Sequence, residues 1–207
     1  MLASRLADKY RYENCAVVAL DDGGAIIGAE ISGRLHCALS ITISQEIDLP
    51  REPWAVGGIA PDGQFVYNPQ YSKADLDEIA DENRGFIEEQ KINKFHDIND
   101  IIGEAGIVDR DALDGQNIIL TSEGLADSFK LDLIMTFLKT VKYEKIIVAT
   151  PIASVKVVDW MHVHADDIYC LSVVEEFTDT NHYYDLQDVP DHETILKIVN
   201  QNILNWQ

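Results

Sequence analysis

The sequence has few positive charges, few cysteines and no long hydrophobic run. Lysine and arginine number 16 against 36 aspartate and glutamate residues, which gives a formal charge of −20. Such a surface repels nucleic-acid phosphate and anionic lipid, so neither is an expected partner. No apolar run approaches the length of a membrane span, and the first residues are polar and charged, unlike a signal peptide. We therefore expect a cytoplasmic location.

The three cysteines, Cys15, Cys37 and Cys170, stand among apolar neighbours. Their odd number argues against a disulfide framework or a zinc site and predicts reduced thiols in the core. Hydrophobic residues make up 46% of the chain and charged residues 25%, which is ordinary for a globular protein. A length of 207 residues suits one domain. We expect a single domain over residues 1–207, with an insertion at about 45–105 that forms a hood or arm.

Short apolar runs alternate with amphipathic stretches along the chain. The runs predict buried strands at residues 15–20, 38–43, 118–121, 146–149 and 168–173. Between them, apolar residues at helical spacing predict helices over residues 26–35 and 131–141. Pro151 is expected to open a further helix, and residues 192–204 are expected to form the last one. This alternation predicts an α/β fold, a mostly parallel central sheet with helices on both faces.

The expected insertion has a different pattern. Residues 45–53 are typical of a loop, and residues 56–60 and 64–67 flank a Pro-Asp-Gly turn, which predicts a hairpin. Ser72 is a suitable cap for one helix that carries Leu76, Ile79, Phe86 and Ile87 on a single face. Residues 72–94 form an acidic arm that could cross to a second copy of the chain, so a homodimer is expected.

Ligands of parallel sheets bind beyond the carboxyl ends of the strands, at the point where the strand order reverses. The loops to watch are the ones that follow residues 15–20 and 118–121. The candidate pocket residues of the first loop are Asp21, Asp22, Gly23 and Gly24. The candidate pocket residues of the second loop are Ser122, Glu123, Gly124, Leu125, Ala126, Asp127 and Ser128.

These loops and the C-terminal segment together resemble the type I phosphoribosyltransferases. Residues 117–130 lie where that family has four apolar residues, two acids and a Gly/Thr-rich loop, and residues 20–31 lie where it has a Pro-Arg-Gly-Gly-like turn. Residues 56–68 match its hairpin, and residues 170–177 with His182, Tyr183 and Tyr184 match its last strand and aromatic flap. The resemblance implies this fold and a magnesium-assisted reaction of phosphoribosyl pyrophosphate with a nitrogen nucleophile.

The chain departs from the family pattern where phosphate would bind. Only Glu123 remains of the acid pair, and Asp127 stands at a threonine position of the loop. Asp22 stands at the arginine position of the first turn. A carboxylate about 4 Å from a phosphate costs roughly 4 kcal/mol per charge pair at a dielectric near 20. A helix N-terminus contributes only about 0.3–1 kcal/mol, so repulsion should dominate.

Other residues have two interpretations each. Asp127 could cap the helix that begins near Phe129, a role favoured over a catalytic or metal-binding one. His162 and His164 could ligate a metal with Asp166 and Asp167, although a surface junction is favoured. Tyr183 and Tyr184 could form a flap over the pocket or pack on the sheet. Asp21, Asp22, Glu123 and Asp127 could together hold a divalent cation or a polyamine, or be solvated loop acids.

Three functional hypotheses follow. The preferred one is a phosphoribosyltransferase-fold protein that lacks transferase activity and acts in ligand binding, regulation or assembly. The alternative is an active phosphoribosyltransferase in which Glu123 acts on the ribose, with magnesium as the cofactor and a nucleobase-like acceptor. The third is an enzyme that acts on a neutral or cationic small molecule in the same crevice.

Overall fold

The computed structural model describes residues 1–102, 108–184 and 190–204. The chain divides into two compact units. The first unit comprises Met1–Thr42, Val108–Ser128 and Thr140–Gln207, and the second comprises Ile43–Ile107 and Phe129–Lys139. Most of the second unit is therefore the expected insertion at 45–105, whose last three residues lie outside the described ones. That the whole chain acts as a single domain stays a prediction. No helix in the described ranges has the length and apolar character needed to cross a membrane.

The first unit is built on a five-stranded sheet in which all neighbouring strands are parallel. Its strands are β1 (Cys15–Ala19), β2 (Ala38–Ile41), β6 (Asn117–Thr121), β7 (Lys145–Ser154) and β8 (Asp167–Val174). The spatial order is β2-β1-β6-β7-β8, so the order reverses between β1 and β6. The predicted α/β fold with a parallel central sheet is confirmed.

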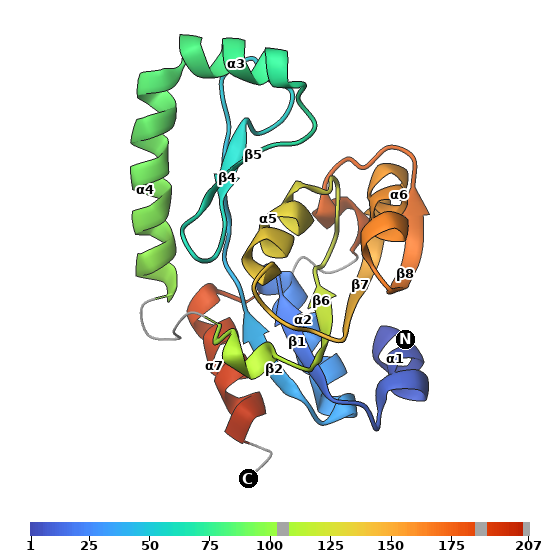
Figure 1. Ribbon diagram of the computed structural model, residues 1–207. Helices are drawn as coiled ribbons and strands as arrows, with labels where there is room; N and C mark the ends of the chain where they lie inside the picture. The colour runs from blue at the N-terminus through green and yellow to red at the C-terminus, as the bar shows by residue number, and fades with distance from the viewer. Residues whose placement is uncertain (103–107, 185–189, 205–207) are drawn as a thin grey trace. The chain divides into compact units, whose positions relative to one another are not determined.

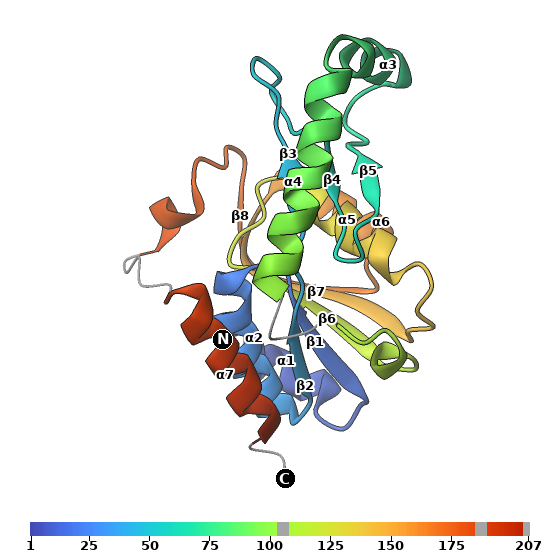
Figure 2. The same ribbon diagram turned by 90° about the vertical axis from the view of Figure 1, so that its left-hand side faces the viewer.

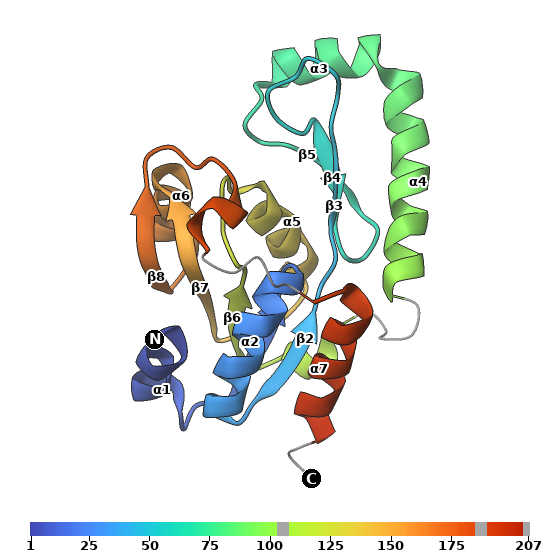
Figure 3. The same cartoon turned by 180° about the vertical axis from the view of Figure 1, so that it is seen from behind.

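Three helices cover one face of this sheet, as Figure 3 shows: α1 (Leu2–Tyr10), α2 (Asp22–Leu35) and α7 (His192–Leu204). Alternate residues of β1, among them Val17 and Ala19, join a buried cluster with Leu6 of α1, Ile31 of α2 and Ile195 of α7. The opposite face carries α6 (Val155–His164), which packs on β7 and β8 (Figure 1). Both faces of β1 are buried, which explains its unbroken apolar sequence.

The second unit contains a small antiparallel sheet of β3 (Gln45–Ile47), β4 (Gly57–Ile59) and β5 (Phe65–Tyr67). The hairpin from β4 to β5 is confirmed, and Gly63 in its turn has φ +83°, a conformation that favours glycine. The unit also contains α3 (Lys73–Glu82), α4 (Arg84–Ile102) and α5 (Phe129–Leu138). Figure 2 shows α4 running along β3 and β4, where buried Ile87 contacts the cluster around Ile47 and Val56.

Two expectations about the insertion are wrong in part. Residues 45–47, expected in a loop, form β3, because pairing with β4 satisfies backbone groups that the sequence pattern does not reveal. The single expected helix after Ser72 is two helices, with Asn83 between them as the C-cap of α3. The Asn83 side chain donates to the Ile79 carbonyl oxygen, which ends the first helix. The cap at Ser72 is confirmed, since Ser72 Oγ accepts from the Asp75 backbone N–H at 3.2 Å.

Two further differences lie in the first unit. Pro151 does not open a helix but lies inside β7. The pairing of β7 with β8 skips this residue, so no hydrogen bond of the sheet needs the N–H that proline lacks. The helix that follows begins at Val155 and is capped by Ser154, whose Oγ accepts from the Val157 N–H. The helix α1 was not expected, although Leu2, Leu6 and Tyr10 recur at helical spacing and are buried. Two short 3₁₀ helices, η1 (Asp111–Leu113) and η2 (Thr180–Tyr183), complete the elements.

Candidate functional site

The two expected loops meet at the carboxyl edge of the sheet in the first unit. The strands β1 and β6 are parallel neighbours, and their last residues, Ala19 and Thr121, are paired. The turn into α2 and the loop that begins at Ser122 follow directly. Because the strand order reverses between β1 and β6, this is the position where parallel sheets bind ligands.

The carboxylate of Asp21 occupies the N-terminus of α2. Asp21 is the N-cap of the helix, and its Oδ1 accepts from the Gly24 N–H at 2.6 Å and from the Glu123 N–H at 3.4 Å. Its Oδ2 accepts from the Ser122 hydroxyl at 2.6 Å. Backbone N–H groups at a helix N-terminus are the donors that bind anions in proteins. Here a side chain of the protein itself takes that place.

Two glycines allow the close approach of the loops. A Cβ atom at Gly24 would lie 2.4 Å from the Thr121 carbonyl oxygen, and a Cβ atom at Gly23 would lie 2.0 Å from Glu123 Oε2. The Thr121 hydroxyl also donates to the Gly24 carbonyl oxygen at 2.9 Å. The Glu123 side chain therefore lies against the first turn of α2, in space that any residue other than glycine would fill.

Asp22 pairs with a residue that sequence reasoning missed. Its Oδ1 lies 2.7 Å from Nδ1 of His192, the first residue of α7. The Nε2 atom of the same ring is buried and has no hydrogen-bond partner among the residues that the structure describes. No sequence signal links two residues 170 positions apart; only the packing of α7 on α2 brings them together. Asp22 is thus not a free carboxylate at the turn.

The expected flap residues contact the second loop in different ways. The Tyr184 hydroxyl donates to the Glu123 carbonyl oxygen at 2.6 Å, and burial, followed by the charges of Glu123 and Asp21, raises the pKa of Tyr184 to about 12. The Tyr183 hydroxyl instead donates to the Glu176 carbonyl oxygen. A Cβ atom at Gly124 would lie 3.0 Å from Thr180, so this segment lies close to the loop. The role of Tyr183 and Tyr184 as a flap over a bound ligand stays a prediction.

The rest of the second loop is tied to β7. Leu125 is buried and forms a bridge with Ala153; its N–H donates to the Ile152 carbonyl oxygen, and its own carbonyl oxygen accepts from the Ser154 N–H. Ala126 is exposed, and Asp127 and Ser128 are half-buried. As expected, α5 begins at Phe129, so Ser128 rather than Asp127 directly precedes it. Capping by Asp127 stays a prediction.

The site residues do not fit a magnesium ion well. Both oxygens of Asp21 accept hydrogen bonds, and Asp22 is paired with His192, whereas magnesium requires several free oxygen ligands in octahedral geometry. Over the ranges that the structure describes, no group of three or more His, Cys, Asp or Glu residues is placed to hold a metal ion.

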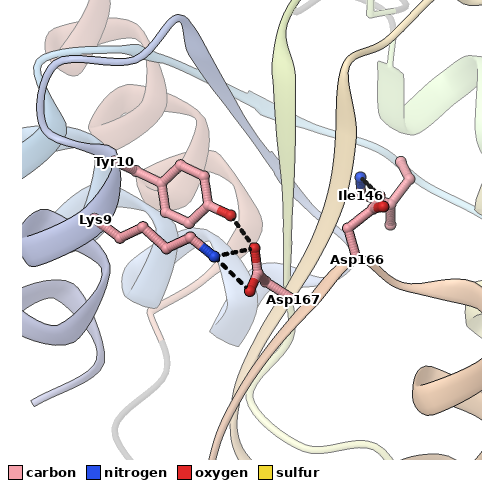
Figure 4. Close-up of polar contacts among 5 residues, drawn as sticks. All are labelled: Lys9, Tyr10, Ile146, Asp166 and Asp167. Atoms are coloured by element: carbon pink, nitrogen blue, oxygen red, sulfur yellow. Dashed lines mark hydrogen bonds and ion pairs between the residues drawn. The ribbon is translucent and has the colours of Figure 1, made fainter.

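The other suggested metal ligands, the two histidines of α6 and Asp166, each bond to a different backbone group. His162 and His164 sit in the last turn of α6 and contact the carbonyl oxygens of Val158 and Trp160. Asp166 Oδ2 accepts from the Ile146 N–H at 2.8 Å (Figure 4). These contacts agree with a helix-to-strand junction, the interpretation favoured from the sequence.

Asp167 belongs to a separate network at the amino end of the sheet. Lys9 Nζ lies 2.6 Å from one oxygen of Asp167, and the Tyr10 hydroxyl donates to the same oxygen (Figure 4). Burial alone would raise the pKa of Asp167, but the bonds from Lys9 and Tyr10 and the charge of Lys145 hold it below its ordinary value. The network borders a polar cavity of about 340 Å³, also lined by Lys145, at the end of the sheet opposite to the candidate site.

Comparison with known proteins places the fold. No protein-family model matches the sequence, and no curated protein matches it either. The chain is similar to the protein TT1426 from Thermus thermophilus, with 19% identity and a TM-score of 0.71 over 97% of this chain and 93% of that one. This similarity shows that the two chains share their fold.

Two further solved structures superpose less well. A purine phosphoribosyltransferase from Pyrococcus horikoshii has 13% identity and a TM-score of 0.46, over 85% of this chain and 82% of that one. A hypothetical protein from Neisseria gonorrhoeae, solved with bound ppGpp, has 13% identity and a TM-score of 0.44, over 95% of this chain and 87% of that one.

Proposed function

We propose that this protein is phosphoribosyltransferase-like in fold but lacks transferase activity, and that it acts in ligand binding, regulation or assembly. The fold assignment to this family rests on the order and spacing of the sequence segments described above. The observed strand order, with a reversal between β1 and β6, agrees with it. The loss of activity rests on the chemistry of the carboxyl edge.

One observation supports the loss of activity most directly. The Asp21 carboxylate accepts from Gly24, Glu123 and Ser122, and so uses the donors that a phosphate would need. A phosphate that displaced it would have to bind next to a carboxylate, at a cost of roughly 4 kcal/mol at about 4 Å and a dielectric near 20. Because Glu123 lies against Gly23, a second acid borders the same helix terminus.

The test is isothermal titration calorimetry of the chain with phosphoribosyl pyrophosphate and magnesium. We expect no binding at micromolar concentrations, and micromolar affinity would refute the proposal. The variant Asp22→Arg restores the basic residue of the family pattern and should gain affinity for the anion. The exposed turn residue Asp62 offers a matched control, because Asp62→Arg changes the net charge equally and should bind nothing.

The active transferase remains the alternative, because Glu123 is the one acid of the pair that is retained and it lies beside the glycine turn. An active transferase would release pyrophosphate in the presence of a nucleobase, and the variant Glu123→Ala would no longer do so. Absence of release across a panel of nucleobases would count against it. A neutral or cationic small molecule, in contrast, would meet no repulsion from the acids of this edge.

The same proposal includes self-association as a homodimer and a cytoplasmic location. The thiols Cys15, Cys37 and Cys170 are free, which supports a reducing compartment. Burial raises the pKa of Cys15 to about 11 and that of Cys37 to about 12, so both thiols are poor nucleophiles. Sedimentation at several protein concentrations tests the dimer.

A further inference from the structure

The polar cavity at the amino end of the parallel sheet is separate from the candidate site, and the proposed function gives it no role. Its volume is about 340 Å³, in the range of about 300–1,000 Å³ that small-molecule pockets occupy. Its lining comes from the end of α1 and from the first residues of β6 and β7, all within the first unit. The side chains of this lining therefore define what the cavity can bind.

One wall of the cavity is formed by side chains that bond to one another. Lys9 Nζ lies 2.7 and 2.6 Å from the two carboxylate oxygens of Asp167, and the Tyr10 hydroxyl donates to one of them (Figure 4). Tyr10 itself is buried. Because both oxygens of Asp167 are in use, the charge of Lys9 is already matched, and this wall supports the cavity rather than binding a ligand.

Lys145, at the start of β7, is the second lysine of the lining, and its ammonium group is available. The Nζ atom lies 5.9 Å from the centre of the Tyr10 ring, near the outer limit of a cation–π contact. The Lys145 side chain is half-buried and makes no hydrogen bond or ion pair with any described residue. A carboxylate is the partner that such an ammonium binds most strongly, through a charge-assisted hydrogen bond.

Asn117, at the start of β6, offers an acceptor beside this donor. The residue is 7% exposed, and its Nδ2 donates to the Asn14 carbonyl oxygen at 2.9 Å. Its Oδ1 accepts no hydrogen bond within the described part of the chain. Because buried polar atoms almost always have a partner, an acceptor at the wall of a cavity indicates a ligand N–H group or a water molecule there.

Two carboxylates complete the lining. Glu13 and Glu144 are exposed, and neither forms a hydrogen bond or ion pair through its side chain with a described residue. Since Lys9 is matched by Asp167, the charges left at the cavity are one positive, on Lys145, and two negative. A phosphate or another simple anion would meet net repulsion, and a simple diamine would leave Lys145 without a partner. The complementary ligand has one carboxylate and two positive groups.

We propose that this cavity binds an α-amino acid with a basic side chain. The ligand carboxylate accepts from the Lys145 ammonium, the α-ammonium donates to Asn117 Oδ1, and the side-chain cation lies near Glu13 and Glu144. The site lies at the end of the sheet opposite to the carboxyl edge, so it is independent of whether the protein binds phosphoribosyl pyrophosphate.

The experiment is isothermal titration calorimetry of the full chain with L-lysine and two matched probes. L-norleucine lacks the side-chain ammonium, and cadaverine lacks the carboxylate. We expect L-lysine to bind at millimolar concentration or below and cadaverine to bind about tenfold more weakly, because it leaves Lys145 unpaired. L-norleucine should bind about threefold more weakly, because pairs with exposed glutamates contribute little.

Two variants assign the binding to this cavity. Lys145→Met keeps most of the side-chain length and removes the charge, so the affinity for L-lysine should fall about tenfold. Simple attraction of cations by an acidic chain predicts the opposite, because this variant is more negative than the wild type. Glu144→Gln, at an exposed position, should weaken L-lysine and leave L-norleucine unchanged. The control is Lys142→Met, an exposed lysine outside the lining, which should change neither affinity.

Four results would overturn the proposal. They are no binding of L-lysine, equal affinity for cadaverine and L-lysine, unchanged affinity in Lys145→Met, and binding that Glu123→Ala removes while Lys145→Met retains it, which would place the ligand at the carboxyl edge. Circular dichroism checks the fold of each variant. If Lys145→Met does not fold, the comparison of L-lysine with L-norleucine in Glu144→Gln decides, and equal weakening of both would contradict the assignment.

Discussion

The two ends of the sheet in the first unit each hold a hydrogen-bond network centred on a partly buried aspartate, and the two networks differ in their donors. At the carboxyl end, Asp21 accepts from the Gly24 N–H in the first turn of α2 and from the Glu123 N–H and the Ser122 hydroxyl of the second loop. At the amino end, Asp167 accepts from the Lys9 ammonium and the Tyr10 hydroxyl. The first set of donors is the kind that binds a ligand anion, and the second is an ion pair that fastens α1 to β8.

The two networks also differ in their position relative to the expected ligand site. The network of Asp167 joins α1 to β8 through Lys9 and Tyr10, at the end of the sheet opposite to the candidate site. The network of Asp21 lies at the reversal of the strand order, where a ligand is expected. The Asp21 carboxylate there caps α2 and binds the second loop; under the proposed function it also takes the place of a ligand anion.

The largest effect is expected where the loops of the carboxyl end approach most closely. Gly24→Ala would place a Cβ atom 2.4 Å from the Thr121 backbone oxygen, so we expect a loss of about 3 kcal/mol in the free energy of unfolding. Gly33→Ala in the same helix meets no atom within 4 Å and should stabilise by about 0.5–1 kcal/mol. Urea denaturation measures the free energy of unfolding of both variants. Equal values would contradict the close approach of the Gly24 turn to Thr121.

A smaller loss is expected when the Asp21 carboxylate is removed. Asp21→Ala leaves the N–H groups of Gly24 and Glu123 without this acceptor and removes the bond from the Ser122 hydroxyl, so we expect a loss of about 2 kcal/mol in unfolding free energy. Ser72→Ala removes an exposed cap that accepts from one N–H and should cost less, about 1 kcal/mol. If added inorganic phosphate restores the stability of Asp21→Ala, the site still accepts an anion once its own carboxylate is gone.

The smallest effect is expected at the amino end, and it depends on pH. Asp167→Asn should lower the free energy of unfolding by about 1 kcal/mol at neutral pH. The pKa of Asp167 is lowered in the folded state, so its contribution is complete above the ordinary value of 3.8 and disappears as the pH falls through the lower folded value. The free energies of unfolding of wild type and variant should therefore converge in acid. The exposed Asp159→Asn serves as the control, and a gap that persists in acid would contradict the assignment.

Much of the first unit could be predicted from periodicity, because buried parallel strands are apolar on both faces. The start of α7 at His192 and the hairpin turn at Gly63 were also predictable from local signals. Two misses have local causes: Pro151 was expected in a helix because proline often occupies a first turn, and Asn83 was not recognised as a helix end. The helix α1 could have been found from the spacing of Leu2, Leu6 and Tyr10.

The candidate site was predictable in position but not in its bonding. The sequence placed Asp21 and Glu123 on loops at one edge of the sheet, because parallel strands end together. Asp21 caps α2 through the nearby Gly24 N–H, a contact that a local pattern can predict. Its bonds from Ser122 and Glu123 join distant segments and appear only in the folded chain. The pair of Asp22 and His192 joins helices α2 and α7, and no periodic pattern encodes it.

The sequence by itself determined the acidic charge, the five strands of the parallel sheet and the loops in which a ligand site would lie, because these follow from composition and local periodicity. The tertiary structure alone decided which donors each carboxylate receives, which edge of the sheet is exposed and where α7 packs. Those features depend on side chains far apart in the chain, whose distances are fixed only when the elements pack together.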